Sequence, residues 1–209
     1  MAASSLITKI SLTRPMRSFR KNKKLRKCSC GGCIIDDIRN EDWGILSTRL
    51  SCSSCVDQLL SNSKGNFNFL SEACKYNIPD DVFYQLAISK PSLVFTADSK
   101  TGRYPLHVAA LYGANERVIE LLSVSYPEAA SEPDMDGCTP LHLACYNGQI
   151  TCETAELLCK AGPSAVSMKD KFQDTPLDKM ETSAYAKVAD KKVMKLLKGY
   201  SRRQSAPGQ

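Results

Sequence analysis

The side chains best suited to catalysis or metal binding in this 209-residue chain are two histidines and ten cysteines. The two histidines are His107 and His142, and Cys145 follows the second one after three residues. On a helix this spacing places a thiol beside an imidazole, which is the pairing that activates a cysteine nucleophile. Whether such a dyad exists depends on the elements that carry these residues.

Four further cysteines form two Cys-x-x-Cys pairs, Cys30/Cys33 and Cys52/Cys55, with 18 residues between them. This spacing falls within the range of four-thiolate zinc sites. A redox dithiol and a Ser/Cys-rich segment without metal are the alternatives, and Cys28 has no role in the zinc hypothesis. The sequence therefore leaves zinc open and indicates no other cofactor.

Other signatures of chemistry are missing from the sequence. It contains no Gly-x-x-x-x-Gly-Lys-Ser/Thr loop, no Gly-x-Gly-x-x-Gly and no His-Glu-x-x-His. No apolar run approaches the roughly 20 residues of a membrane-spanning helix, and none looks like a secretory signal. Without a secretory signal, ten cysteines favour a reducing compartment. We expect neither a small-molecule substrate nor membrane insertion.

Positive charge is concentrated in residues 1–35, which carry nine Lys or Arg and no acid, whereas the rest has 19 basic and 22 acidic residues. We expect this segment to be a disordered basic leader. Its cluster at 20–27 is typical of nuclear-import or anionic-surface patches, and its Ser- and Arg-bearing start also fits an organellar transit segment. The mildly acidic body gives no charge reason to bind nucleic acid. We expect a cytoplasmic or nuclear protein, with organellar import left open.

A repeated spacing organises the rest of the chain. Pro91, Pro127 and Pro163 recur every 36 residues. Four more series keep this period to within one residue: Asp98, Asp134 and Asp170; Pro105, Pro140 and Pro176; Ala73, Ala109 and Ala144; Leu86, Leu122 and Leu158. Five series with one period predict a repeat architecture.

Each repeat has the local signals of a helix–turn–helix unit. A proline begins the first helix, where its missing N–H costs nothing, and a threonine precedes it as a cap in two units: Pro105, Thr139–Pro140 and Thr175–Pro176. Apolar residues follow at helical spacing, and Gly113 and Gly148 end the helices at a left-handed position.

These residues resemble the ankyrin repeat, whose consensus is Asp-x-x-Gly-x-Thr-Pro-Leu-His-x-Ala-Ala-x-x-Gly. Residues 134–148 match nearly every slot, residues 103–113 form a second copy, and 70–74 and 174–178 are weaker end copies. The resemblance covers about residues 64–199. It implies an all-α solenoid of about four stacked helix-turn-helix units with β-turn or hairpin fingers. The residues that carry it are Pro105, Leu106, His107, Gly113, Thr139, Pro140, Leu141, His142, Gly148, Thr175 and Pro176.

The resemblance also implies roles for the reactive side chains. Both histidines would be structural, bridging the threonine and neighbouring backbone, and Cys145 would fill a buried alanine slot. We therefore expect no catalytic dyad and no enzyme. The two or three residues beyond the usual period of about 33 are expected between the second helix and the turn, in residues 90–94, 126–130 and 162–166.

Repeats of this family bind other proteins, and the resemblance places their contacts in the turn before Thr-Pro and just after Ala-Ala. The matching residues are Ser99, Lys100, Arg103, Leu111 and Tyr112; Met135, Asp136, Cys138, Tyr146 and Asn147; and Lys171, Phe172 and Asp174. Tyr112, Tyr146 and Phe172 are expected on one face as aromatic anchors. We predict a noncatalytic adaptor for a protein partner whose identity stays open. The alternative is a zinc-binding regulator whose N-terminal four-cysteine module contacts nucleic acid while the repeats recruit a partner.

The sequence thus divides into four predicted segments. They are a basic leader (1–35), a Cys-containing linker or short helical region (36–63), the repeat domain (64–199) and a mobile tail (200–209). In residues 201–205, Ser205 completes the Arg-Arg-x-Ser pattern of basophilic kinase substrates and is a candidate phosphorylation site.

Overall fold

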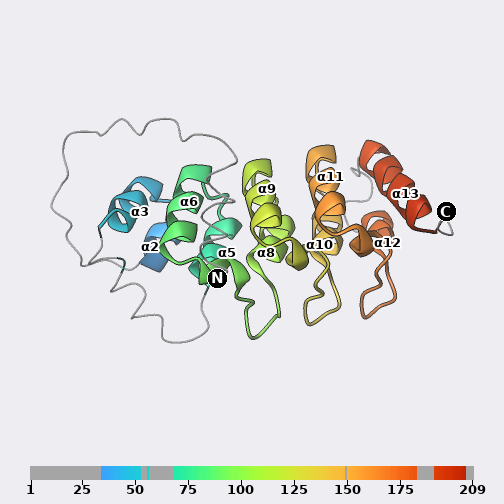
Figure 1. Ribbon diagram of the computed structural model, residues 1–209, viewed down its shortest axis with the longest axis horizontal. Helices are drawn as coiled ribbons and strands as arrows, with labels where there is room; N and C mark the ends of the chain where they lie inside the picture. Colours follow the sequence, from blue (N-terminus) through green and yellow to red (C-terminus); the bar gives the residue numbers. More distant parts are fainter. Residues whose placement is uncertain (1–33, 53–55, 57–67, 149, 183–190, 206–209) are drawn as a thin grey trace.

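The computed structural model describes residues 34–52, 56, 68–148, 150–182 and 191–205, and within these ranges the regular structure is entirely helical. The described helices form five pairs that follow one another along one direction (Figure 1). The pairs are α2 (Ile34–Arg39) with α3 (Trp43–Leu50), α5 (Phe69–Lys75) with α6 (Asp80–Ser89), α8 (Pro105–Tyr112) with α9 (Glu116–Ser125), α10 (Pro140–Asn147) with α11 (Cys152–Ala161), and α12 (Pro176–Thr182) with α13 (Lys191–Ser205).

The pairs stack into two parallel rows. The inner row is α2, α5, α8, α10 and α12, and the outer row is α3, α6, α9, α11 and α13 (Figure 1). Within each row a helix packs against the next one along the chain. Each pair therefore contacts mainly its neighbours, which confirms the predicted solenoid.

Equivalent apolar residues of successive units form one continuous core. Leu106 and Leu141 are the second residues of the inner helices α8 and α10 and are at most 1% exposed, and the buried Ala109 and Ala144 follow them one turn later. The small alanine side chains allow neighbouring inner helices to approach closely. The thiol of Cys145 takes the next slot and is fully buried, as the resemblance implied.

The residues that lengthen the repeat form a short helical turn after the outer helices α6, α9 and α11, at the predicted position. These turns are α7 (Ser92–Phe95), η1 (Pro127–Ala130) and η2 (Pro163–Val166). Each buries two apolar residues against the core: Leu93 and Val94, Ala129 and Ala130, or Ala165 and Val166. The insertion therefore adds core surface to the three units that contain α6, α9 and α11.

The segment predicted as a linker or short helical region is an additional stacked pair. α2 begins at Ile34, before the predicted boundary, and the α2/α3 pair packs on α5 and α6. Ile38 and Leu46 are fully buried in this contact. Glu41 lies in the connecting turn with φ 57°, the left-handed conformation that Asn77 and Gly113 adopt in the next two units. The described array thus has one pair more than the four units expected.

α13 continues to Ser205, so the boundary predicted at residue 200 between the repeat domain and the tail falls inside this helix. α13 is anchored by Val193 and Leu197, which are at most 1% exposed. The predicted leader up to residue 33 and residues 206–209 lie outside the described residues.

Three loops, here called the fingers (residues 98–103, 134–138 and 170–174), project from the array and precede inner helices α8, α10 and α12 (Figure 1). Each is closed by a main-chain hydrogen bond between its ends: Asp98 N to Arg103 O at 2.9 Å, Asp134 N to Cys138 O at 2.8 Å, and Asp170 N to Asp174 O at 3.0 Å. Adjacent fingers are also joined, because Met135 N donates to Thr101 O (2.9 Å) and Lys171 N donates to Asp136 O (3.1 Å). The predicted turn-like fingers are confirmed.

A left-handed residue turns each finger, but only two of the three are glycines. Gly102, Gly137 and Gln173 have φ of 71°, 78° and 68°. A Cβ on Gly137 would lie 3.1 Å from the Cα of Asp170 in the next finger, and one on Gly102 would lie 3.1 Å from Met135 N. In the described chain no further finger follows Gln173, so a side chain there meets no such neighbour.

We predict opposite stability effects at these two equivalent positions. Gln173→Gly relieves left-handed strain and should raise the free energy of unfolding by about 0.5–1 kcal/mol, whereas Gly137→Ala adds strain and a main-chain clash and should lower it by about 2 kcal/mol. Urea unfolding of the two variants beside the parent chain measures both effects. Equal effects at the two positions would contradict the proposed role of the neighbouring finger.

Candidate functional site

A buried aspartate organises the second finger. Asp134 Oδ1 accepts hydrogen bonds from the backbone N–H groups of Asp136 (2.8 Å) and Cys138 (2.9 Å), and its Oδ2 accepts one from Arg103 Nε (2.9 Å) of the preceding finger. The side chain of Asp134 is fully buried. Its charge is therefore compensated by one cation and two main-chain dipoles, as a buried carboxylate requires.

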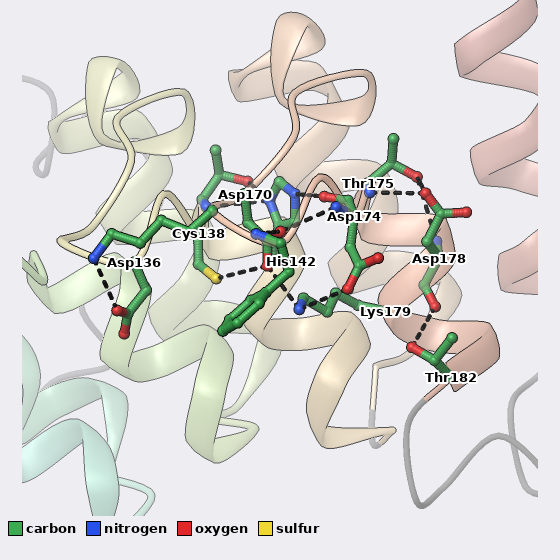
Figure 2. A network of polar contacts seen from close by, with 12 residues as sticks. Asp136, Cys138, His142, Asp170, Asp174, Thr175, Asp178, Lys179 and Thr182 are labelled. Carbon is green, nitrogen blue, oxygen red and sulfur yellow. Dashed lines mark hydrogen bonds and ion pairs between the residues drawn. The ribbon is translucent and has the colours of Figure 1, made fainter.

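The third finger repeats this arrangement around Asp170, whose side chain is also fully buried. Its Oδ1 accepts from the backbone N–H groups of Phe172 (2.8 Å) and Asp174 (3.0 Å), and Lys179 Nζ lies 2.6 Å from Oδ2. Burial acts to raise the pKa of Asp170, but these hydrogen bonds and the Lys179 charge outweigh it and hold the pKa below its usual value. Figure 2 shows this network at the base of the finger.

Three predicted contact residues share one slot: Arg103 and Cys138 contact the next finger, whereas Asp174 contacts the helix α12 that follows its own finger. Arg103 pairs with Asp134, and Cys138 Sγ lies 3.8 Å from Asp170 Oδ2. In the last finger Asp174 pairs with Lys179 Nζ at 3.0 Å. Cys138 is only 8% exposed, so its thiol does not reach the partner-facing surface, and burial raises its pKa to about 12.

Each histidine bridges two units. His107 Nδ1 accepts from Tyr104 N (3.3 Å) at the start of its own helix, while Nε2 contacts the Glu132 carbonyl (2.9 Å) just before the next finger. Since a carbonyl only accepts, Nε2 carries the proton and the ring is neutral. The His107 side chain is fully buried, and burial lowers its pKa to about 4.

His142 makes the same bridge one unit later. Its Nδ1 accepts from Thr139 N (3.2 Å) and lies 2.9 Å from Thr139 Oγ1, and its Nε2 contacts the Asp174 carbonyl at 3.1 Å (Figure 2). Burial lowers the pKa of His142 as well. Both imidazoles are therefore structural, and the buried Cys145 thiol, whose pKa burial raises, is not activated by His142.

The units on either side of the two histidine-bearing units replace histidine with residues that the sequence reasoning missed. In the α5/α6 unit Asn68 caps α5 by accepting from Leu70 N (3.0 Å) and Ser71 N (3.1 Å), while Nδ2 donates forward to Leu93 O (2.7 Å) and Thr96 O (2.9 Å). Asn68 lies 36 residues before Tyr104, so the repeat period itself could have identified it.

In the last unit Asp178 lies 36 residues after His142. Of the two contacts that each histidine makes, Asp178 keeps the one that caps the start of its own inner helix, α12. Its Oδ2 accepts from Thr175 N (2.8 Å) and Thr175 Oγ1 (2.7 Å), as Figure 2 shows. No following finger exists in the described chain to receive a forward hydrogen bond. An acceptor-only carboxylate is sufficient there.

The remaining predicted contact residues lie on the finger tips and at the ends of α8 and α10. Ser99, Lys100, Met135, Asp136, Lys171, Phe172, Tyr112 and Tyr146 are exposed, and Leu111 and Asn147 are half-buried. Lys171 Nζ lies 3.3 Å from Asp136 Oδ1 between two tips, and the Lys179 ammonium lies 4.9 Å from the centre of the Phe172 ring. We call these ten residues the contact face.

The two tyrosines are not in equivalent positions. Tyr112 is the eighth residue of α8, whereas Tyr146 is the seventh residue of α10. Adjacent positions are rotated by about 100° around a helix axis. The prediction of a single row with Phe172 is therefore too simple, since the equivalent of Tyr112 in α10 is Asn147.

Comparison with known proteins agrees with this geometry. Residues 70–170 match the family described as ankyrin repeats (3 copies). The repeat array is an ankyrin-repeat domain. α2/α3 and α12/α13 extend it beyond the matched residues at both ends.

Two curated relatives are similar to most of this chain. They are named SMC5-SMC6 complex localization factor protein 1, from Bos taurus (31% identity over 164 residues, 76% of this chain) and Homo sapiens (30% over 178 residues, 79% of this chain). The match covers 15% and 16% of those proteins, so this chain corresponds to a small part of their length.

Several predicted sites fall outside the ankyrin repeats. Cys30, Cys33 and Cys55 lie outside the described residues, and Cys52 is half-buried, so the zinc hypothesis stays a prediction. Within the described ranges, no three His, Cys, Asp or Glu side chains gather as metal ligands, and no helix is long and apolar enough to cross a membrane. The side chain of Ser205 is also outside the described set.

We predict that the ankyrin domain loses stability between pH 7 and pH 5. The unfolded chain takes up protons near the ordinary histidine pKa of about 6.5, whereas the folded pKa values are lower, so stability is full at neutral pH and falls on acidification. The contribution from His107 alone is about 2 kcal/mol over this range.

Urea unfolding at pH 7, 6 and 5 measures this loss while carboxylates remain ionised. His107→Gln lowers stability at every pH but should reduce the fall between pH 7 and 5 by about 2 kcal/mol. A fall of unchanged size in that variant would show that His107 is not held neutral in the folded protein.

Proposed function

We propose that this chain is a noncatalytic adaptor that holds a protein partner on the contact face. Ankyrin repeats are protein-interaction domains, and the chain carries at least the three copies that the family match covers. The proposal adds the position of the binding surface: the finger tips and the C-terminal ends of inner helices α8 and α10.

The distribution of exposed apolar side chains carries the proposal. Four large apolar residues of the contact face are 51–74% exposed: Tyr112, Met135, Tyr146 and Phe172. The other exposed large apolar residues of the described chain, Ile45, Ile88 and Val124, lie on outer helices and are 39–50% exposed. Aromatic residues and methionine are enriched at protein interfaces, whereas aliphatic residues such as leucine and valine are under-represented among interface hot spots. The contact face is thus the better candidate.

The rigidity of the face supports the same conclusion. Every finger is closed on itself and hydrogen-bonded to its neighbour, and the second and third fingers are also fixed by a buried aspartate at the base. A surface that is already ordered before binding loses little conformational entropy on association. A small number of exposed anchor side chains is therefore sufficient for the contact face to bind a protein partner.

The relatives suggest what kind of task the adaptor performs. They are named for the localization of the SMC5-SMC6 complex, and the part of them that this chain matches includes the repeats. We propose that this chain likewise recruits a partner to an assembly of that kind, in the cytoplasm or nucleus. Affinity capture with the full chain as bait would identify the partner.

The test is a binding titration of the captured partner against contact-face variants. Tyr112→Ala with Tyr146→Ala should weaken binding by at least about 100-fold, because interface anchors contribute about 2 kcal/mol each or more. The melting temperature should change by no more than about 2 °C, since both side chains are exposed.

The matched control is Ile88→Ala with Val124→Ala, two exposed apolar residues of the outer helices. It should leave affinity within about twofold of the parent chain. Equal weakening by both double variants, or by the control alone, would place the partner on the outer helices. Unfolding of the tyrosine variant would show that its side chains belong to the core.

A further inference from the structure

α13, the last outer helix, has an unusual charge distribution. Its 15 residues include four lysines and two arginines and no acid. The chain beyond the leader has 19 basic and 22 acidic residues, so its net charge does not reveal that α13 is basic. In the structure it is gathered on one helix at the end of the array, where no further repeat covers it in the described chain (Figure 1).

Four of these cations form a row along one side of the helix. Lys191, Lys195, Lys198 and Arg202 follow one another at intervals of four, three and four residues, and all are exposed. On an α-helix these positions lie within about 60° of each other and extend over about 16 Å. We call them the cation row.

The apolar side of α13 faces the opposite direction. Val193 and Leu197 are buried against the repeat array, which fixes the helix orientation. Among the described residues, the cation row has one carboxylate partner, Glu181, whose Oε1 lies 3.4 Å from Lys198 Nζ in an exposed pair. An exposed pair of this kind contributes little energy and exchanges readily for another anion.

We propose that the cation row binds the phosphate backbone of nucleic acid, independently of the contact face. Phosphate contacts require only suitably spaced cations, because affinity comes from the release of condensed counterions. The row contains no side chain arranged to read base edges, so binding should not depend on sequence.

The chemistry of the row favours nucleic acid over two other polyanions. Binding to a lipid surface by an amphipathic helix needs an exposed apolar side, and that of α13 is buried in the array. An acidic protein surface normally adds exposed aromatic or apolar anchors. The described apolar side chains of α13 that are not fully buried, Met194, Leu196 and Tyr200, pack partly against the core, and the Arg203 guanidinium lies 5.5 Å from the centre of the Tyr200 ring.

The experiment measures binding of a fluorescent 20-base-pair duplex DNA to the full chain by anisotropy between 50 and 200 mM salt. The basic leader also carries cations, so the measurements use a background in which Lys21, Lys23, Lys24, Arg26 and Lys27 are glutamine. In that background, glutamine at all four positions of the cation row should weaken binding at 50 mM salt at least about tenfold. It should also reduce the slope of log K against log salt by about three to four.

The control replaces three exposed lysines that lie outside both α13 and the contact face by glutamine: Lys75, Lys160 and Lys169. It should leave the slope nearly unchanged, and circular dichroism should show equal helix content in all variants. Equal slopes for the row and control variants would overturn the proposal. It would also fail if polyglutamate of equal charge displaced the labelled duplex better than unlabelled duplex does, since an acidic protein would then be the ligand.

Discussion

Successive units of this protein are held in register by a side chain that serves two units at once. Asn68, His107 and His142 each satisfy backbone N–H groups at the start of an inner helix and also reach a carbonyl of the following unit. Both partners are main-chain groups that would otherwise be buried without hydrogen bonds. The energetic penalty for leaving them unsatisfied makes the spacing between units specific, whereas apolar packing alone would tolerate sliding.

The fingers depend on this bridge and extend it. The carbonyl that His142 contacts belongs to Asp174, the residue that closes the third finger and pairs with Lys179. Fixing the inner helices therefore also fixes the base of each finger, and the exposed tips are placed at regular intervals. The rigid contact face is thus a consequence of the hydrogen bonds that stack the repeats.

The ends of the array show what happens when the next unit is missing. Asp178 keeps the capping half of the bridge, and Gln173 occupies a left-handed position where the preceding units have glycine. Both substitutions remove a feature that only a following finger requires. The end of the described array also leaves α13 uncovered on one side, which is where its cations gather.

Much of the fold was predictable because the period recurs in residues with specific backbone roles. Prolines, aspartates and histidines at intervals of 35 or 36 located the helices, the fingers and the inserted turns. The α2/α3 pair was predicted only as a linker or short helical region, because residues 34–50 contain neither the proline nor the histidine that mark the ankyrin units. Burial of Cys138 was missed for a different reason: the slot holds an arginine in the preceding finger, and only the structure places it against Asp170.

Nitrogen NMR of the two imidazole rings in the folded 209-residue chain at pH 7 tests directly whether the histidines bridge adjacent units. We predict that His107 and His142 are both neutral and carry their proton on Nε2, each with the shift of a hydrogen-bonded N–H. A charged ring, or a proton on Nδ1 in either residue, would show that the bridge between units does not exist.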